Sequence, residues 1–291
     1  MDKSVTVTVP PILACLRKAA EHLGQELLLS PNGDEQNVFV QKYGGFIDDI
    51  SKMGDGELKS IADADVGVVN RFLEANGFSI RLPASPPNSL NVASVLNILV
   101  EWTKAGIVTE VKTDKGVFPA AKLTTGVGFF SWKDHTVVSI ETKPGFKVPP
   151  CRVWMTPVGD LVGGDIKEVL STFTDMPPYA GGTESGYNGV IFPMVDYDSE
   201  VDLSWIEGLH VTPEWFVATA VQQTKFRMNE KGARAKSGVG MNLTKGASPR
   251  PKQTFIIDKP FALWITRKGI RFPLFSGIFA EDVWKRPESL D

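Results

Sequence analysis

The 291 residues suffice for one large domain or two ordinary ones, and a content of 42% hydrophobic and 22% charged residues is typical of a globular protein. The 34 acidic and 31 basic residues nearly cancel, so the charge predicts neither a nucleic acid nor an anionic membrane as partner. Only Cys15 and Cys151 are present, which excludes a disulfide scaffold, and no apolar run approaches the roughly 20 residues of a membrane helix. Residues 1–6 lack the pattern of a signal peptide, so we expect a cytoplasmic protein or a trimmed secreted one.

The first third of the chain alternates between helical and strand-like patterns. Apolar residues three to four apart predict a helix that begins near Pro10. Residues 27–31 are interpreted as a short buried strand, and the alternation over residues 78–82 also favours a strand. The apolar spacing over residues 90–102 predicts an amphipathic helix that ends near Gly106.

Strand patterns dominate the rest of the chain. We expect strands at residues 120–130, 137–141, 190–198, 216–228, 255–257, 261–266 and 272–279, with a short helix starting at residue 202. Because helices come early and strands late, the chain is predicted to be α+β rather than built from alternating βαβ units.

The segment 232–252 is a long polar stretch between two predicted strands. Loops of more than about 12–15 residues are uncommon inside compact domains and are usually functional or disordered. Small or apolar residues alternate here with the long charged Arg234 and Lys236; they are Ala233, Ala235, Ser237 and Val239. A strand shows alternate residues to opposite faces, so this loop could become a strand with one small face. A solvated hairpin linker is the simpler alternative.

Three motifs of the last third resemble the serpin family of serine-protease inhibitors. The hinge signature of that family is matched by Asn229-Glu230-Lys231-Gly232, its aromatic strand and Lys-Pro-Phe turn by residues 255–261, and its closing strand by residues 273–277. The motifs occur in the order of the family and at about its spacing. The resemblance implies one serpin-like α+β domain over residues 1–291, with a large central mixed β-sheet, smaller sheets, helices mainly in the N-terminal half, and an exposed reactive-centre loop at about 233–252.

Weaker likeness extends upstream and brings departures with it. Residues 90–106 resemble the helix that crosses the main sheet of the family, and residues 123–132 resemble its central strand, which would place Trp132 beneath the point where the loop inserts. Ser30 resembles the buried serine at an early helix entry, and Ser30, Trp132 and Gln222 are expected in the region where the sheet opens. The histidine that serpins carry on the hinge strand falls at Gln222, and the asparagine it bonds falls at about Thr125. The chain is also shorter than most serpins, mainly between residues 31 and 90.

The resemblance implies a suicide-substrate mechanism with a monomeric inhibitor and a serine protease as partner. The protease cleaves the loop, forms an acyl-enzyme and is trapped as the loop inserts into the main sheet. The hinge would consist of Glu230, Gly232, Ala233, Ala235, Ser237 and Val239, with Ala233 entering first. Counting along the loop favours Lys245-Gly246 as the reactive bond, which suits a trypsin-like enzyme; Ala247-Ser248 would suit an elastase-like or subtilisin-like one.

Two other functions are weighed beside inhibition. A non-inhibitory serpin-like carrier, chaperone or scaffold is favoured by Arg234, Lys236 and Gln222. An unrelated α+β enzyme has no supporting motif, so neither catalysis nor a cofactor is predicted. Three widely spaced histidines, at positions 22, 135 and 210, do not indicate a metal site. The alternating acids of residues 196–202 are interpreted as a solvated strand edge rather than a cation site.

Overall fold

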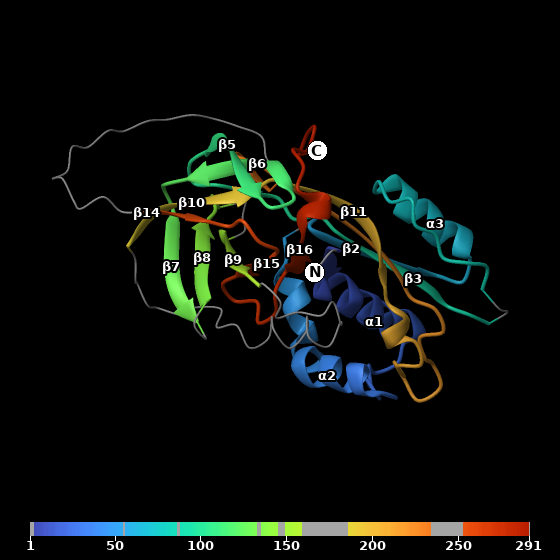
Figure 1. The fold of residues 1–291 in the computed structure, drawn as a ribbon. Helices are drawn as coiled ribbons and strands as arrows, with labels where there is room; N and C mark the ends of the chain where they lie inside the picture. Colours follow the sequence, from blue (N-terminus) through green and yellow to red (C-terminus); the bar gives the residue numbers. More distant parts are fainter. Residues whose placement is uncertain are drawn as a thin grey trace.

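The computed structural model describes residues 3–54, 56–85, 88–132, 135–144, 149–158, 186–233 and 253–290. Its helices are α1 (Val9–Leu23), α2 (Asp34–Tyr43) and α3 (Val66–Ala75), with 3-10 turns at Gly44–Lys52, Ser204–Ile206 and Glu281–Val283. Its strands are β1 (Val5–Val7), β2 (Leu58–Asp63), β3 (Asn91–Leu96), β4 (Val100–Glu101), β5 (Ile107–Thr113), β6 (Gly116–Leu123), β7 (Val127–Trp132), β8 (His135–Glu141), β9 (Cys151–Pro157), β10 (Tyr187–Pro193), β11 (Val195–Asp202), β12 (Val221–Met228), β13 (Gly232–Ala233), β14 (Gln253–Ile256), β15 (Phe261–Arg267) and β16 (Phe275–Phe279). The three α-helices precede most strands, so the α+β prediction is confirmed (Figure 1).

A six-stranded antiparallel sheet holds most of the core. Its order is β1-β16-β15-β9-β8-β7, so strands from both ends of the described chain lie in one sheet. Every residue of β15 is buried, which explains why its sequence is a nearly unbroken apolar run rather than an alternating one. The sheet therefore has protein packed against both of its faces.

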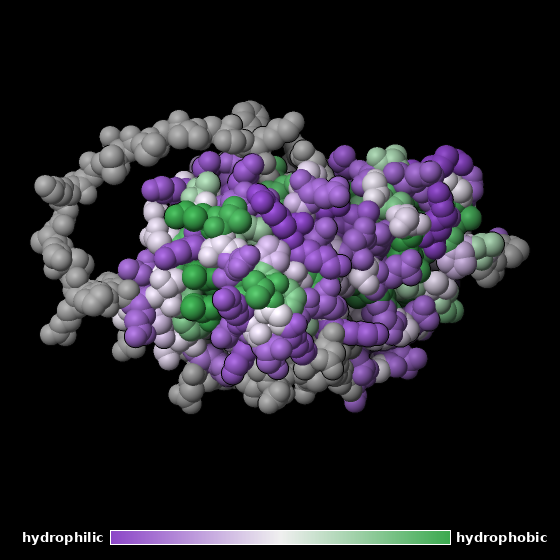
Figure 2. Space-filling view, turned by 45° about the horizontal axis from the view of Figure 1, so that its top comes forward, coloured by the Kyte–Doolittle hydropathy of each residue, from purple (hydrophilic) through white to green (hydrophobic). Residues whose placement is uncertain are grey.

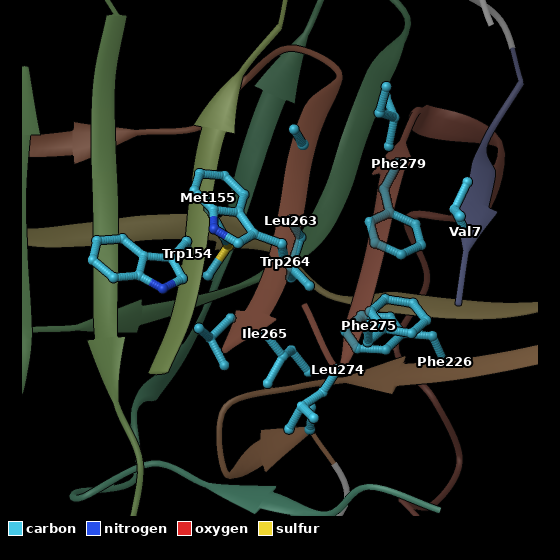
Figure 3. Close-up of a cluster of buried hydrophobic side chains, with 14 of the residues drawn as sticks. Val7, Trp154, Met155, Phe226, Leu263, Trp264, Ile265, Leu274, Phe275 and Phe279 are labelled. Carbon is cyan, nitrogen blue, oxygen red and sulfur yellow. The ribbon is translucent and has the colours of Figure 1, made fainter. Parts of the chain in front are cut away.

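Aromatic rings fill the space around this sheet (Figure 3). Trp154 of β9 stacks on Trp264 of β15 with ring centroids 6.0 Å apart, and the Trp154 Nε1 donates to Thr266 Oγ1 at 2.9 Å. Phe226 of β12 stacks on Phe275 at 4.6 Å and on Phe279 at 5.1 Å. These stacks join the hinge strand β12 to the six-stranded sheet, since Phe226 belongs to the first and the other two rings to the second.

A four-stranded sheet of order β14-β10-β6-β5 forms one end of the molecule. The strand β14 runs parallel to β10, and the other pairs are antiparallel. Ile107, Val108, Val117 and Ile256 of this sheet are exposed, and apolar surface gathers in Figure 2 over the end where Figure 1 places β5, β6, β7 and β14.

Two antiparallel strand pairs, β2-β3 and β11-β12, and the shorter pair β4-β13 complete the fold. They are separate ladders: within the ranges that the structure describes, no backbone pairing joins β3 to β12. Helix α3 packs on β2 and β3 through a small second core of Val69, Leu73, Ile80, Ala93 and Val95 (Figure 1). The chain that follows α3 then reaches β12, where the backbone N–H groups of Ser79 and Ile80 donate to Gln223 Oε1 at 2.9 and 3.1 Å.

Two arginine–carboxylate pairs tie the segment before β2 to the six-stranded sheet. Arg267, at the end of β15, makes a bidentate pair with Glu57, with both N···O distances 2.7 Å. Burial pushes the pKa of Glu57 upward, but the hydrogen bonds from Arg267 and Gly54 N together with the charge of Arg267 outweigh it, so the pKa lies below its ordinary value. Asp49 accepts from Arg271 Nε at 2.8 Å, and this bond with that of Lys52 holds the Asp49 pKa far below its ordinary value.

Several predicted elements are corrected by the structure. Residues 90–102 are not a helix: Asn91–Leu96 form β3 and Val100–Glu101 form β4. The alternating burial of β3 shows the reason, because a half-buried strand with branched residues also contains apolar positions three and four apart. Residues 27–31 and 78–82 are irregular, apart from a single bridge between Ser30 and His210.

Two predicted strands are each divided between two sheets. Residues 120–130 contain the end of β6 and the start of β7, separated by a turn at Gly126 with a φ of 69°. Residues 190–198 contain the end of β10 and the start of β11, separated at Met194. Continuous apolar character hides such a break, since both sides of the turn remain buried.

Candidate functional site: the hinge

The hinge motif forms a tight turn at the end of β12. Asn229 N donates to Gly232 O at 2.9 Å, and Lys231 N donates to Asn229 Oδ1 at 2.8 Å. An asparagine side chain that bonds the backbone two residues later is a common way to stabilise a turn. The chain therefore turns at 229–232 between β12 and β13.

The strand β13 is the beginning of the predicted insertion segment. Gly232 pairs with Glu101 and Ala233 with Val100, so the hinge lies antiparallel to β4. Gly232 has a φ of 158°, and a Cβ at this position would clash with the Val100 carbonyl oxygen. Only glycine allows this approach, and Ala233 is buried beside it.

Three successive carbonyl groups of the hinge accept hydrogen bonds from residues 102–106. Trp102 Nε1 donates to Asn229 O at 3.0 Å, Gly106 N to Glu230 O at 2.6 Å, and Trp102 N to Lys231 O at 3.2 Å. Trp102 is buried, and its ring meets Phe192 edge to face at 6.0 Å. A Cβ on Gly106 would lie 2.7 Å from Lys122 O, so this position also requires glycine.

Trp102, and not the expected Trp132, is the tryptophan that donates hydrogen bonds to the hinge. The structure places Trp132 at the end of β7, opposite His135 in the six-stranded sheet. Trp102 and Gly106 were instead assigned to a helix, which hid their role at the hinge. The alternation of Val100, Glu101 and Trp102 was the signal for a strand that ends in a buried tryptophan.

Two other residues of the expected sheet-opening region are separated in the structure. Gln222 lies on β12, where its Nε2 donates to Thr8 O at 3.5 Å and its Oε1 is buried without a hydrogen bond from a described residue. Thr8 directly precedes α1, so it occupies the helix entry that the sequence interpretation gave to Ser30. Ser30 is exposed and pairs with His210, and Thr125 lies in the turn between β6 and β7.

Glu230 is the buried charged group of the hinge. Its side chain is 10% exposed, and Oε1 lies 3.5 Å from Arg286 Nη2. Oε2 is shielded from solvent and accepts no hydrogen bond from the described residues. Glu230 is thus a buried carboxylate with one long ion pair, rather than an exposed surface charge.

The remaining predicted site residues lie outside the described residues. These are Ala235, Ser237 and Val239 of the hinge segment and Lys245, Gly246, Ala247 and Ser248 of the two candidate bonds. Their roles stay predictions.

Acidic residues within 196–202 form ion pairs across a strand ladder. Asp196 pairs with Arg227 at 3.2 Å and Asp198 with Lys225 at 3.0 Å, both across the β11-β12 ladder. Among the described residues, no group of three His, Cys, Asp or Glu side chains could hold a metal, and no described helix is long and apolar enough to cross a membrane. Cys15 and Cys151 are both free thiols.

Comparison with known proteins identifies the fold. No family model and no curated protein sequence matches the chain. Solved serpin structures do match it: maspin has a TM-score of 0.60 and 13% identity, over 95% of this chain and 92% of the maspin chain. Human glycosylated kallistatin has a TM-score of 0.58 and 10% identity, over 98% of this chain and 92% of its own. Thyroxine-binding globulin in complex with thyroxine has a TM-score of 0.57 and 13% identity, over 95% and 92%.

At these identities the likeness shows the fold alone, and the chain has the serpin fold. The resemblance that the three C-terminal motifs carry is therefore confirmed at the level of architecture. The hinge of this chain combines three features: Gly232, where there is no room for a side chain, the buried Trp102 and the buried Glu230.

Proposed function

We propose that the protein inhibits a serine protease by loop insertion: the protease cleaves within 234–252, and the cut loop enters the sheet from the hinge onward. The observation that carries the proposal is the antiparallel pairing of Gly232 and Ala233 with β4. An inserted strand would continue from this pairing, and these two residues already run antiparallel to the strand beside them.

The separation of the strand pairs supports the same proposal. A strand added to a sheet gains backbone hydrogen bonds along its edges, and small side chains let it slide over a packed core. The described residues contain no backbone pairing between β3 and β12, and the entering residues of the loop are small at alternate positions. An uncut protein of this kind is held short of its free-energy minimum by the tether of its own loop.

Trapping of the protease follows from geometry. An acyl-enzyme that is carried along by the inserting loop loses the alignment of its catalytic groups, and misaligned groups cannot complete hydrolysis. We place the reactive bond at Lys245-Gly246, with a trypsin-like partner, and Ala247-Ser248 with an elastase-like or subtilisin-like partner as the alternative.

The test is incubation with trypsin, elastase and subtilisin, followed by denaturing electrophoresis. We expect a covalent adduct with one of the three enzymes and a large rise in melting temperature of the cleaved protein. Lys245→Ala should abolish the adduct with trypsin, whereas Ser248→Ala is the control that leaves it in place. Cleavage that yields neither an adduct nor a thermal gain would rule out inhibition.

A non-inhibitory carrier or scaffold is the second candidate. The specific observation in its favour is the segment after α3. Ser79 and Ile80 are hydrogen-bonded to Gln223 of β12, and these bonds must break before β12 can move away from β3 to admit a new strand. Thyroxine-binding globulin, one of the similar structures, is complexed with thyroxine. Cleavage of the loop with no adduct and no change in melting temperature is the result expected for this function.

A further inference from the structure

A cavity of about 490 Å³ lies between the hinge and the segment that follows β16. The hinge side is lined by residues 229–231 and the other side by residues 286–290. Cavities of this volume accommodate small organic molecules in many proteins.

The wall formed by residues 286–290 is held in place by the buried ring of Trp284. That ring meets Phe118 edge to face at 5.3 Å and Phe261 at 6.1 Å. Lys115 Nζ also lies 3.6 Å from Glu281 Oε2, and Leu290 is buried. The cavity therefore has anchored walls on both sides, because the hinge is bonded to Trp102 and Gly106.

The Glu230 carboxylate lines this cavity with unused hydrogen-bonding capacity. An ionised carboxylate offers about four acceptor sites. Among the described residues, one oxygen has the single 3.5 Å contact with Arg286, and the other is buried and accepts no hydrogen bond. Because Oε2 is shielded from solvent, Oε1 is the oxygen that a ligand in the cavity can contact. A buried carboxylate with so few donors is destabilising, so a ligand that supplies N–H groups to Oε1 would be stabilised here.

The charges of the lining decide which ligand fits. Glu230 and Glu288 are acidic, whereas Lys231 and Arg286 are basic. A bare metal ion is disfavoured, since a cation would have to displace or sit beside the two basic side chains. A molecule with both a cationic N–H donor and a carboxylate matches the set: the donor toward Glu230 and the carboxylate toward Arg286 and Lys231.

We propose that this cavity binds a small zwitterion of the amino-acid type, with a guanidinium or ammonium group bonded to Glu230. The ligand bridges the hinge and residues 286–290. A bound ligand also slows the movement of the hinge, a consequence that rests on the proposed loop insertion, whereas the binding itself does not.

Isothermal titration calorimetry of the intact protein with L-arginine tests the site. Guanidinium at millimolar concentration is the cation-only probe and acetate the anion-only probe. We expect one arginine per chain, with both half-probes bound at least about tenfold more weakly, since each makes only one of the two contacts. Glu230→Gln should weaken arginine binding about 10- to 100-fold. The exposed Glu214→Gln, which does not line the cavity, is the matched control and should leave binding unchanged.

A second variant keeps the test independent of the folding of Glu230→Gln. Leu290→Trp fills the cavity from the opposite wall without changing a charge, and it should also abolish binding. No saturable heat with arginine up to about 10 mM, or binding that Leu290→Trp leaves intact, overturns the site. A protease adduct that forms at the same rate with and without bound arginine would overturn only the effect on the hinge, and calorimetry would still decide the binding.

Discussion

The six-stranded sheet and the two ladders β2-β3 and β11-β12 differ in how completely their strands are paired. In the six-stranded sheet, each strand is hydrogen-bonded to its neighbours in the order β1-β16-β15-β9-β8-β7, and stacked aromatic rings pack against the sheet. In the second, two short ladders stand without backbone pairing to each other in the described residues, and β13 is bonded to β4 through only two residues. The first arrangement is one continuous sheet, whereas the second leaves strand edges to which the cut loop would add a strand under the proposed function.

This difference indicates which part of the molecule can open locally without unfolding. A change within the six-stranded sheet should alter global stability, because its side chains have no alternative packing. A change at the hinge should alter local opening more than global stability, because few contacts hold β13 in place. Substitutions in the two regions can break or sharpen that contrast.

The largest effect is expected for Trp264→Ala in the six-stranded sheet. Loss of the ring that stacks on Trp154 leaves a cavity, and such truncations cost about 3–5 kcal/mol. Urea unfolding followed by circular dichroism measures the change. Val117→Ala, at an exposed position of β6, is the control and should cost less than about 0.5 kcal/mol. Equal losses for the two variants would contradict the core role of β15.

Arg267→Met should follow, with a loss of about 3 kcal/mol. The substitution removes the partner of Glu57 and leaves a partly buried carboxylate whose other close contact is Gly54 N at 2.6 Å. The double variant with Glu57→Gln should recover part of the loss, because it removes the unpaired charge. If the double variant is as unstable as the single one, the pair acts through packing alone.

Glu57 and Asp49 should also make the protein less stable in acid. We expect this loss of stability to be smaller than the effect of Arg267→Met. Both carboxyl groups have a lowered pKa in the folded protein, so they stabilise it above their ordinary values near 4. That contribution disappears as the pH falls through the folded pKa. Melting temperatures measured from pH 6 to pH 2 should decline below about pH 4, and Asp49→Asn should make the decline shallower. A decline that is unchanged in this variant would exclude Asp49 as its source.

At the hinge, Gly232→Ala should cost about 1–3 kcal/mol of local stability, because the φ of 158° and the clash with the Val100 carbonyl must be relieved by detaching β13. Hydrogen exchange of the amides in 100–106 and 229–233 measures the opening. Gly45→Ala, where a Cβ meets nothing within 4 Å, is the matched control. Faster exchange at the hinge with little change in the urea midpoint would support local opening. A global loss of stability would contradict it.

The smallest effect is expected for Trp102→Phe. The ring and its contact with Phe192 are largely kept, but the Nε1 bond to Asn229 O is lost, which costs about 1 kcal/mol. The exchange rate of the Lys231 amide reports it, and Trp132→Phe is the control outside the hinge. An effect of Trp132→Phe on that amide as large as that of Trp102→Phe would contradict the placement of Trp102.

The sequence predicts the C-terminal strands well because their apolar residues form long buried runs. β15 and β16 are buried at every position, and the motifs around them identified the fold. Segments near the hinge are harder, since β3 is half buried and β4 has only two residues, whose partner β13 lies far along the chain. Local spacing cannot reveal a pairing such as Gly232 with Glu101, which depends on the whole fold.

The candidate site shows the same limit. Glu230, Gly232 and Ala233 follow from a local motif, and the structure gives each a contact that the motif could not specify. Trp102 and Gly106 act through hydrogen bonds to residues more than a hundred positions away, so they were missed. The buried position of Glu230 depends in part on Arg286, which no motif connects to it.

The pairing of β1 with β16 has a consequence for synthesis. Val5 lies opposite Ile278, so β1 is synthesised about 270 residues before the strand that pairs with it. An unpaired apolar strand is prone to aggregate, so the nascent chain is exposed to aggregation over this interval. The connection therefore predicts a risk during synthesis that the finished sheet no longer carries.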